Sequence, residues 1–124
     1  FVAPRRVDVV MPDVKYAGGI AETVRIAAFA HEHGVAFSPH NPSGPVCTYA
    51  SLHAAAVAPA VESLELQVCE SDLYFDVVGG ARPVFVEGTF IVPDAPGLGV
   101  SLDDAVLAAH PERRVPQGLD ERLG

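Results

Sequence analysis

The amino-acid sequence predicts an α/β fold in which three parallel strands alternate with two helices and form one part of a larger barrel. Three apolar segments of strand length, at 7–12, 35–38 and 61–66, are separated by two segments of helical character. Short strand–helix–strand connections of this kind give parallel strands with right-handed crossovers. Two such units plus one strand cannot close a barrel, which needs about eight strands. An open three-stranded sheet would leave its edges uncovered, so we expect this chain to be part of a barrel.

The first strand and helix are the clearest of these elements. Residues 7–12 are apolar and rich in valine, as expected of a buried parallel strand. Gly18 and Gly19 follow in a loop, where glycine allows positive φ angles. From 20 to 33 the apolar residues fall on one helical face, and Gly34 then stands where helices commonly end.

The second unit repeats this order. Residues 35–38 predict a short strand, and the loop HNPSGP after it carries His40. Residues 46–57 are rich in alanine and predict a helix that ends before Pro59. Residues 61–66 then predict the third strand.

Beyond residue 70 the composition changes, because glycine, proline and aromatic residues become frequent. The segment VFVEGTFIV predicts a strand or hairpin. SLDDAVLAAH predicts a short helix with Ser101 as its N-cap and Asp104 at the capping-box position. We therefore divide the chain into a barrel part at 1–70, a C-terminal segment at 71–110 and a polar, flexible tail at 111–124.

Charge and cysteine content exclude several classes of protein. The chain has 16 acidic and 8 basic residues, and no basic cluster exceeds two adjacent arginines, so we expect no nucleic-acid binding. No apolar stretch approaches the roughly 18 residues of a membrane span, so we expect no membrane partner. Cys47 and Cys69 show no CxxC spacing, which predicts neither a zinc site nor a disulfide framework. Reduced thiols in a cytoplasmic protein are the expectation.

Three residues able to do acid–base chemistry stand at or near the ends of the predicted strands: Asp13, His40 and Glu65. The C-terminal ends of parallel strands share one mouth, which predicts one site. Asp13 and His40 are 27 residues apart, one strand–helix repeat, so their side chains could meet. A carboxylate bonded to one imidazole nitrogen fixes the tautomer and raises the basicity of the other. Such a pair can remove a proton or protonate a leaving group near neutral pH.

Glu65 follows His40 by 25 residues, again one repeat. Its carboxyl group could hydrogen-bond a substrate carboxylate or a developing enediolate if it is partly protonated. Glu62 and Glu70 compete for this role, but Glu62 lies at the other end of the strand and Glu70 lies past it. Plainer interpretations stay open: Asp13 as a cap of the following loop, His40 as a surface residue and Glu65 as an outward carboxylate.

Other candidates are weaker. His53 falls inside the second predicted helix, where a structural role is expected. Cys47 follows the HNPSGP loop and could approach His40, but nothing indicates the lowered pKa of a catalytic thiol. A metal site built from an Asp, a His and a Glu on separate strands lacks the short ligand spacing that would support it.

The segments PDVKYAGGIAE, SPHNPSGPV and GTFIVPDAPGLGVSLDD together resemble the C-terminal part of enolase-superfamily enzymes. Within that superfamily the resemblance is to the mandelate racemase/muconate lactonizing enzyme family, and it covers about residues 7–110. It implies a TIM-like (β/α)7β barrel, of which this chain supplies strands six to eight and the intervening helices. It also implies that the C-terminal segment packs on a capping domain that the 124 residues do not include.

The family chemistry implied is Mg²⁺-assisted abstraction of the proton α to a carboxylate, which gives an enediolate. By this resemblance His40 is the acid/base of a dyad, Asp13 orients it and raises its basicity, and Glu65 stabilises the enediolate. The HNPSGP loop is most similar to that of galactonate-type dehydratases, which favours a hydro-lyase acting on a small sugar acid. A racemase or epimerase of the same family, and a non-catalytic α/β binding or assembly domain, stay open as alternatives.

The same resemblance places the Mg²⁺ ligands on earlier strands, outside this chain. It implies a homo-oligomeric parent that supplies the metal site, and 124 residues that alone would turn over no substrate. The first residues, FVAPRR, lack an initiator Met and likewise predict that the chain begins inside a longer protein.

Overall fold

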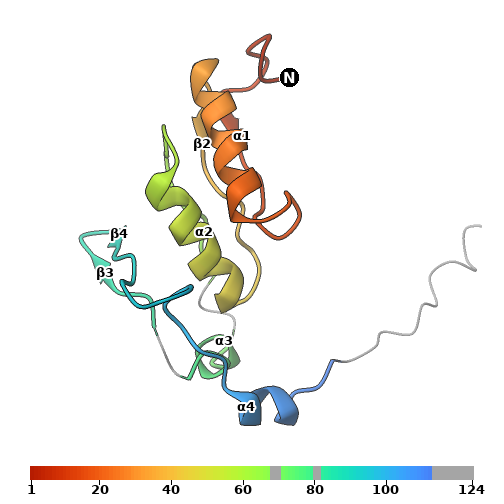
Figure 1. The fold of residues 1–124 in the computed structure, drawn as a ribbon, viewed down its shortest axis with the longest axis vertical. Helices are drawn as coiled ribbons and strands as arrows, with labels where there is room; N and C mark the ends of the chain where they lie inside the picture. The colour runs from red at the N-terminus through yellow and green to blue at the C-terminus, as the bar shows by residue number, and fades with distance from the viewer. Residues whose placement is uncertain (68–70, 80–81, 113–124) are drawn as a thin grey trace, which may run out of the picture.

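The computed structural model describes residues 1–67, 71–79 and 82–112. The elements follow in the order β1 (Val9–Val10), α1 (Ile20–Glu32), β2 (Ala36–Phe37), α2 (Pro45–Val57), α3 (Leu73–Asp76), β3 (Phe85–Val86), β4 (Thr89–Phe90) and α4 (Asp104–Ala109). In Figure 1, α1, β2 and α2 lie together, while the β3–β4 hairpin and α4 lie to one side and below. Cys69, Glu70 and the predicted tail from 113 onward fall outside the described residues.

Strands β1 and β2 are parallel neighbours, as the short connection through α1 predicts. Val9 pairs with Ala36 and Val10 with Phe37. The same register continues past the strands, because Asp13 and His40 form an isolated parallel bridge. The amide of His40 donates to the carbonyl of Pro12 at 3.2 Å. The backbones of Asp13 and His40 are therefore paired in the same register as strands β1 and β2.

The core lies between this small sheet and the two long helices, where α1 packs against both β2 and α2. Phe37 of β2 is completely buried, as are Ala27 and Ala30 of α1 and Ala54 of α2. Small alanine side chains let the helices approach closely, and burial of apolar surface is the main favourable contribution to folding. This core fixes the positions of the strand ends that carry the site.

Helix α1 begins and ends at glycines, as predicted. Gly18 and Gly19 have φ angles of 107° and 94°, and Gly19 is the N-cap. At the other end Gly34 has a φ angle of 68°. The amide of Val35 donates to the carbonyl of Ala30, and that of Gly34 to the carbonyl of His31. These two bonds form a Schellman motif, which explains why the helix ends here.

The third predicted strand, at 61–66, is reduced to a single parallel bridge between Val61 and Phe37. The amide of Glu62 donates to the carbonyl of Phe37, but the next bond joins the amide of Glu65 to the carbonyl of Pro39. An undisturbed parallel register would have used residue 64 there. Pro39 has no amide hydrogen to donate to the third segment, so the regular pairing stops there. The third segment then carries one extra residue between Glu62 and Glu65, as in a β-bulge. The expectation of a regular strand was therefore wrong.

The C-terminal segment contains the hairpin that the sequence allowed. Phe85 pairs with Phe90 across it, and their ring centroids are 4.3 Å apart. Glu87 and Gly88 both have positive φ angles, the condition for a tight turn that matches the twist of the strands. The short helix α3, at Leu73–Asp76, was not predicted.

Helix α4 has a different cap from the predicted one. The carboxylate of Asp103, not the hydroxyl of Ser101, accepts the amides of Ala105 and Val106 at 3.0 Å each. A carboxylate at the N-cap satisfies free amide donors and also interacts favourably with the helix dipole. The prediction of Ser101 as N-cap, with Asp104 at the capping-box position, was wrong.

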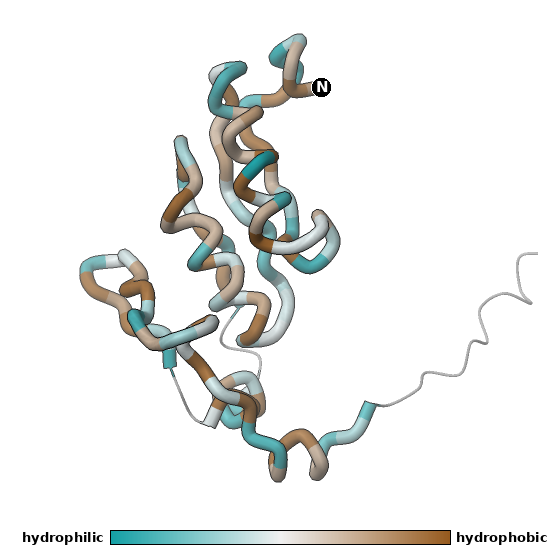
Figure 2. The backbone as a smooth tube through the Cα atoms, viewed as in Figure 1, coloured by the Kyte–Doolittle hydropathy of each residue, from teal (hydrophilic) through white to brown (hydrophobic). Residues whose placement is uncertain are grey.

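Several large apolar side chains of the hairpin region are not covered by the rest of the described chain. The exposed ones are Val84, Phe85, Val86 and Ile91. Figure 2 shows this hydrophobic character along the hairpin. No helix in the described part of the chain is both long enough and apolar enough to span a bilayer.

Candidate active site at the strand ends

Asp13 is the buried centre of the candidate site, with 6% of its surface exposed. One carboxylate oxygen, Oδ1, accepts the backbone amide of Lys15 at 2.8 Å. The other, Oδ2, accepts a hydrogen bond from Nδ1 of His40 at 3.2 Å. Asp13 is therefore both the cap of its own loop and the partner of the histidine, so two interpretations that seemed exclusive apply together.

His40 has one ring nitrogen held and one turned to open space. Its Nδ1 faces Asp13, and its Nε2 lies 4.0 Å from Oε2 of Glu65, too far for a hydrogen bond. The side chain is 42% exposed, so the free nitrogen is accessible to a ligand. An ionised carboxylate only accepts hydrogen bonds, so the neutral imidazole carries its proton on Nδ1. Nε2 is then left as an acceptor that can take a proton.

Glu65 reaches the site through the shifted register described above. Continuing the pairing of Val61 with Phe37 would place Leu64 opposite His40, whereas the extra residue places Glu65 there. A shift of one residue reverses which side chains face a given side of a strand, so this bulge decides which residue enters the site. The structure thus brings Asp13, His40 and Glu65 together.

Asn41 holds Glu65 in place and was not singled out by the sequence. Its backbone amide donates to Oε2 of Glu65 at 3.1 Å, and its side-chain Nδ2 donates to the backbone carbonyl of Glu65 at 3.0 Å. Asn41 is completely buried. Its position directly after His40, in a loop with prolines on both sides, was the one available signal.

The cysteine beside the site is kept protonated by its surroundings. Burial raises the pKa of the Cys47 thiol, and the negative charge of Asp13 raises it further. The sulfur lies 3.9 Å from Oδ1 of Asp13 and donates to it. A raised thiol pKa is opposite to what a nucleophilic cysteine needs, which agrees with the weak prediction for this residue.

Lys15 places a positive charge on the rim of the site. Its Nζ donates to the hydroxyl of Ser43 at 2.8 Å, which connects the loop after Asp13 with the loop after His40. A hydrogen bond with the side chain of Tyr16 raises the pKa of Lys15, so the ammonium group is charged at neutral pH. The sequence contained no pattern that would have assigned Lys15 to the site.

The remaining candidates lie elsewhere. His53 contacts the backbone carbonyl of Leu98 through Nε2 at 3.3 Å, which agrees with a structural role. Glu62 is exposed, and its backbone amide donates a hydrogen bond to the carbonyl of Phe37. Glu70 lies outside the described residues.

The described residues do not fit a magnesium site. Mg²⁺ requires oxygen ligands in near-octahedral arrangement, commonly one or two carboxylates plus water. Here the oxygens of Asp13 are bonded to Lys15 and His40, and Oε2 of Glu65 is bonded to Asn41. Across the described residues, no group of three or more His, Cys, Asp or Glu side chains is arranged to hold a metal ion.

Comparison with known sequences points to one family. The sequence profile of the enolase C-terminal domain-like family matches residues 1–106. The D-galactonate dehydratase of Ralstonia pickettii is 36% identical over 106 residues, which cover 82% of this chain and 28% of that protein. The D-xylonate dehydratase of Haloferax volcanii is 34% identical over 107 residues, covering 86% of this chain and 26% of that protein. The chain thus spans little more than a quarter of the length of these relatives.

Solved structures give the same result. A mandelate racemase/muconate lactonizing enzyme-like protein from Rubrobacter xylanophilus superposes with a TM-score of 0.78 and 41% identity, over 92% of this chain and 29% of that one. A proposed L-alanine-DL-glutamate epimerase from Burkholderia xenovorans, bound to magnesium and fumarate, superposes with a TM-score of 0.79 and 30% identity. That match covers 87% of this chain and 26% of that structure.

Proposed function

Because this chain belongs to the enolase C-terminal domain-like family, we propose that it supplies the acid–base side of a Mg²⁺-dependent sugar-acid dehydratase of the galactonate dehydratase type. The observation that carries this proposal is the orientation of His40, with Nδ1 bonded to Asp13 and Nε2 free beside Glu65. The two dehydratase relatives support the reaction class. The magnesium ligands and the capping domain would come from parts of the protein outside these 124 residues.

In this proposal His40 moves a proton at Nε2. The overall reaction removes the proton α to the substrate carboxylate, which a base from the part of the protein outside these 124 residues would accept, and eliminates water from the β-carbon. Protonated His40 donates the proton of Nε2 to the departing β-hydroxyl group as the carbon–oxygen bond breaks, so that water leaves. Asp13 keeps the ring oriented through Nδ1 and stabilises the imidazolium until that proton is given up.

Glu65 would act on the opposite side of the same space. Its carboxyl group lies 4.0 Å from Nε2 of His40, so a substrate that reaches the histidine also comes close to Glu65. When protonated, the group can donate a hydrogen bond to the enediolate oxygen, where charge develops during the reaction. The Lys15 ammonium on the rim favours entry of an anionic sugar acid.

The experiment that tests this proposal uses the complete translation product that carries this chain. It is assayed with Mg²⁺ and a panel of aldonic acids for formation of the 2-keto-3-deoxy product. The variant His40→Asn should lower kcat by about 10²- to 10⁴-fold, the usual contribution of general acid–base catalysis. His31→Asn, which alters an exposed histidine near the end of α1, is the matched control and should leave kcat unchanged. Full activity of the His40 variant, or no dehydration of any acid, would refute the proposal.

A racemase or epimerase is the second candidate, favoured by the likeness to the Burkholderia xenovorans structure. The same histidine would then return a proton to the opposite face of the α-carbon. Incubation in deuterated water separates the two reactions. A racemase incorporates deuterium at the α-carbon without loss of water, whereas a dehydratase forms the keto acid.

A further inference from the structure

We propose that Asn41 is a positioning residue for Glu65, and that Thr48 and Tyr74 hold Asn41 from the other side. This inference rests on the role proposed above for Glu65. It adds that the geometry of the Glu65 carboxyl group is set by α2 and by the C-terminal segment.

The first step is that Asn41 binds Glu65 at two points. The backbone amide holds the carboxylate oxygen Oε2 at 3.1 Å, and the side-chain Nδ2 holds the backbone carbonyl at 3.0 Å. Two bonds to different parts of one residue restrict both where its backbone lies and where its side chain points. This restriction matters here, because Glu65 follows an irregular, bulged segment that no strand ladder holds.

The second step is that Asn41 is itself held. Nδ2 also donates to Oγ1 of Thr48 at 2.9 Å, and Thr48 lies in the first turns of α2. The hydroxyl of Thr48 is in turn hydrogen-bonded to the hydroxyl of Tyr74 in α3. Burial raises the pKa of Tyr74, so this hydroxyl keeps its proton through the neutral range. The bonds form one continuous series from Glu65 through Asn41 and Thr48 to Tyr74.

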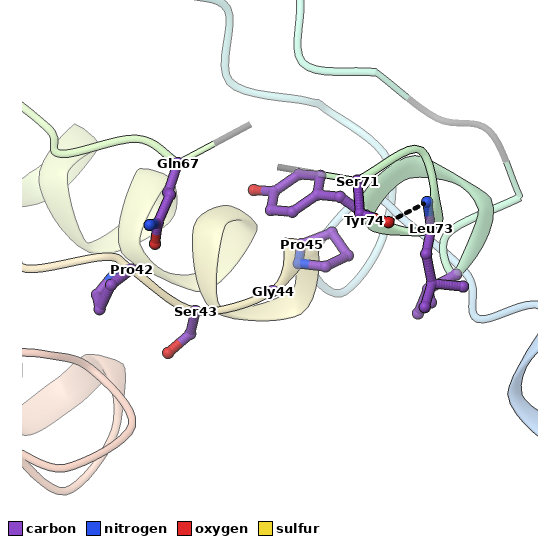
Figure 3. A pocket seen from close by; sticks show the side chains of 9 residues that line it. Pro42, Ser43, Gly44, Pro45, Gln67, Ser71, Leu73 and Tyr74 are labelled. Atoms are coloured by element: carbon purple, nitrogen blue, oxygen red, sulfur yellow. Dashed lines mark hydrogen bonds between the residues drawn. The ribbon is translucent and has the colours of Figure 1, made fainter. Parts of the chain in front are cut away.

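The third step is the placement of Tyr74 between two parts of the chain. Figure 3 shows its side chain extending from α3 toward α2, beside a pocket of about 290 Å³. Pro42, Ser43 and Gly44, the residues that follow Asn41, line the same pocket. The C-terminal segment therefore lies against the loop that carries His40 and Asn41.

A packing role for Asn41 explains these contacts less well. Its side-chain Oδ1 is buried and finds no hydrogen-bond partner among the described residues. A buried polar atom without a partner costs free energy, and a residue that served only to fill this space would not need to carry that cost. The donor Nδ2, which is bonded to Glu65 and Thr48, accounts for an amide at this position.

The test uses the complete translation product, four single variants and one double variant. Asn41→Ala removes both side-chain bonds, and Thr48→Val removes the hydroxyl with little change of shape. Ser51→Ala is the matched control, because it removes another fully buried hydroxyl of α2, one that lies outside the series of bonds from Glu65 to Tyr74. Glu65→Ala provides the background for a double variant with Asn41→Ala.

We expect Asn41→Ala to lower kcat by about 100-fold, the loss that a misplacement of about 1 Å can cause, with KM changed far less. Thr48→Val should lower kcat by roughly tenfold on the same ground, because Asn41 keeps its bond to Glu65. In the Glu65→Ala background, Asn41→Ala should cause no further loss of kcat. A merely structural role would lower yield and melting temperature but leave kcat per folded molecule unchanged. The proposal would be overturned if the kcat losses of the two single substitutions multiplied in the double variant. It would also be overturned if Ser51→Ala lowered kcat as much as Asn41→Ala.

A second readout does not depend on activity. The backbone amide of Asn41 is bonded to the Glu65 carboxylate, so Glu65→Ala and Thr48→Val should both accelerate its hydrogen exchange by about tenfold or more. Ser51→Ala should not. If the protein dehydrates no sugar acid but these exchange rates behave as expected, the proposed function fails and the positioning of Glu65 by Asn41 stands. Unchanged exchange in Glu65→Ala would overturn the positioning itself.

Discussion

Asp13 accepts a hydrogen bond from Nδ1 of His40 across a parallel bridge that the backbones of the same two residues form. Side chains of bridged residues on adjacent strands point to the same side, so the backbone pairing itself places the imidazole beside the carboxylate. Since Asp13 is buried and also accepts the amide of Lys15, it cannot turn away without losing both bonds. The orientation of His40 is therefore a property of the sheet.

The first prediction concerns the tautomer of His40. The neutral imidazole should carry its proton on Nδ1, because the Asp13 carboxylate has no proton to donate. Nitrogen-15 NMR of the two ring nitrogens measures this directly. In Asp13→Asn the amide can donate as well as accept, so a mixture of tautomers is expected. A dominant Nε2–H form in the unaltered protein would contradict the geometry.

The second prediction compares two glutamates three residues apart. Glu65→Gln should lower kcat by about 10²-fold, the usual cost of losing one group that stabilises developing charge. Glu62→Gln should change it by less than about twofold, because this exposed side chain lies outside the site and exposed substitutions have small effects. Steady-state kinetics of the complete translation product measures both. Equal losses would mean that the bulge does not select Glu65.

The third prediction concerns the pH dependence of Cys47. Burial, and then the charge of Asp13, raise the pKa of this thiol, so alkylation by iodoacetamide should be slow at neutral pH. The midpoint of the rate should lie above that of an unfolded thiol and move to lower pH in Asp13→Asn. Tandem mass spectrometry locates the modification at Cys47.

The same raised pKa has a consequence for stability. A thiol whose pKa is higher in the folded state binds its proton more tightly there. Its contribution to stability is complete below the pKa of the unfolded thiol and is lost as the pH rises through the folded pKa. Alkaline destabilisation should therefore be weaker in Cys47→Ser, where this group does not titrate. If Cys47→Ser left the alkaline unfolding curve unchanged, Cys47 would make no contribution to the pH dependence of stability.

The fourth prediction tests the cap of α4. Asp103→Ala should lower the free energy of unfolding by about 1 kcal/mol, because the carboxylate accepts two amides at the helix start. Ser101→Ala, at the position that sequence favoured as N-cap, should change it by less than about 0.5 kcal/mol. Urea denaturation of both variants decides between them. A larger effect at Ser101 would restore the original assignment.

Local chemistry explains which features were predictable from sequence. Gly34 ends α1 because glycine adopts a positive φ angle with little strain, unlike most other residues. A single glycine in the sequence is enough to indicate this helix end. The spacing of Asp13 and His40 predicted their meeting because β1 and β2 keep one register from end to end. The family was likewise predictable, since its motifs are continuous segments.

Other features depended on contacts between distant segments. Asn41 binds Glu65 and Thr48, and Thr48 in turn binds Tyr74, which lies in a helix that no periodicity indicated. The N-cap of α4 was misassigned because two acceptors stood close together and only the backbone angles select one. These outcomes depend on the geometry of elements that are far apart in the chain.

The sequence by itself determined the order of the first two strands and the two long helices, the ends of α1 and the pairing of Asp13 with His40. Only the tertiary structure decided that Glu65, and not Leu64, stands beside His40. The physical reason is the missing amide hydrogen of Pro39, where the ladder with the third segment breaks and one extra residue is accommodated. The spacing of 25 residues between His40 and Glu65 does not reveal this one-residue shift in pairing. A regular strand and a bulged strand can have the same sequence spacing and differ only in which residues pair with the neighbouring strand.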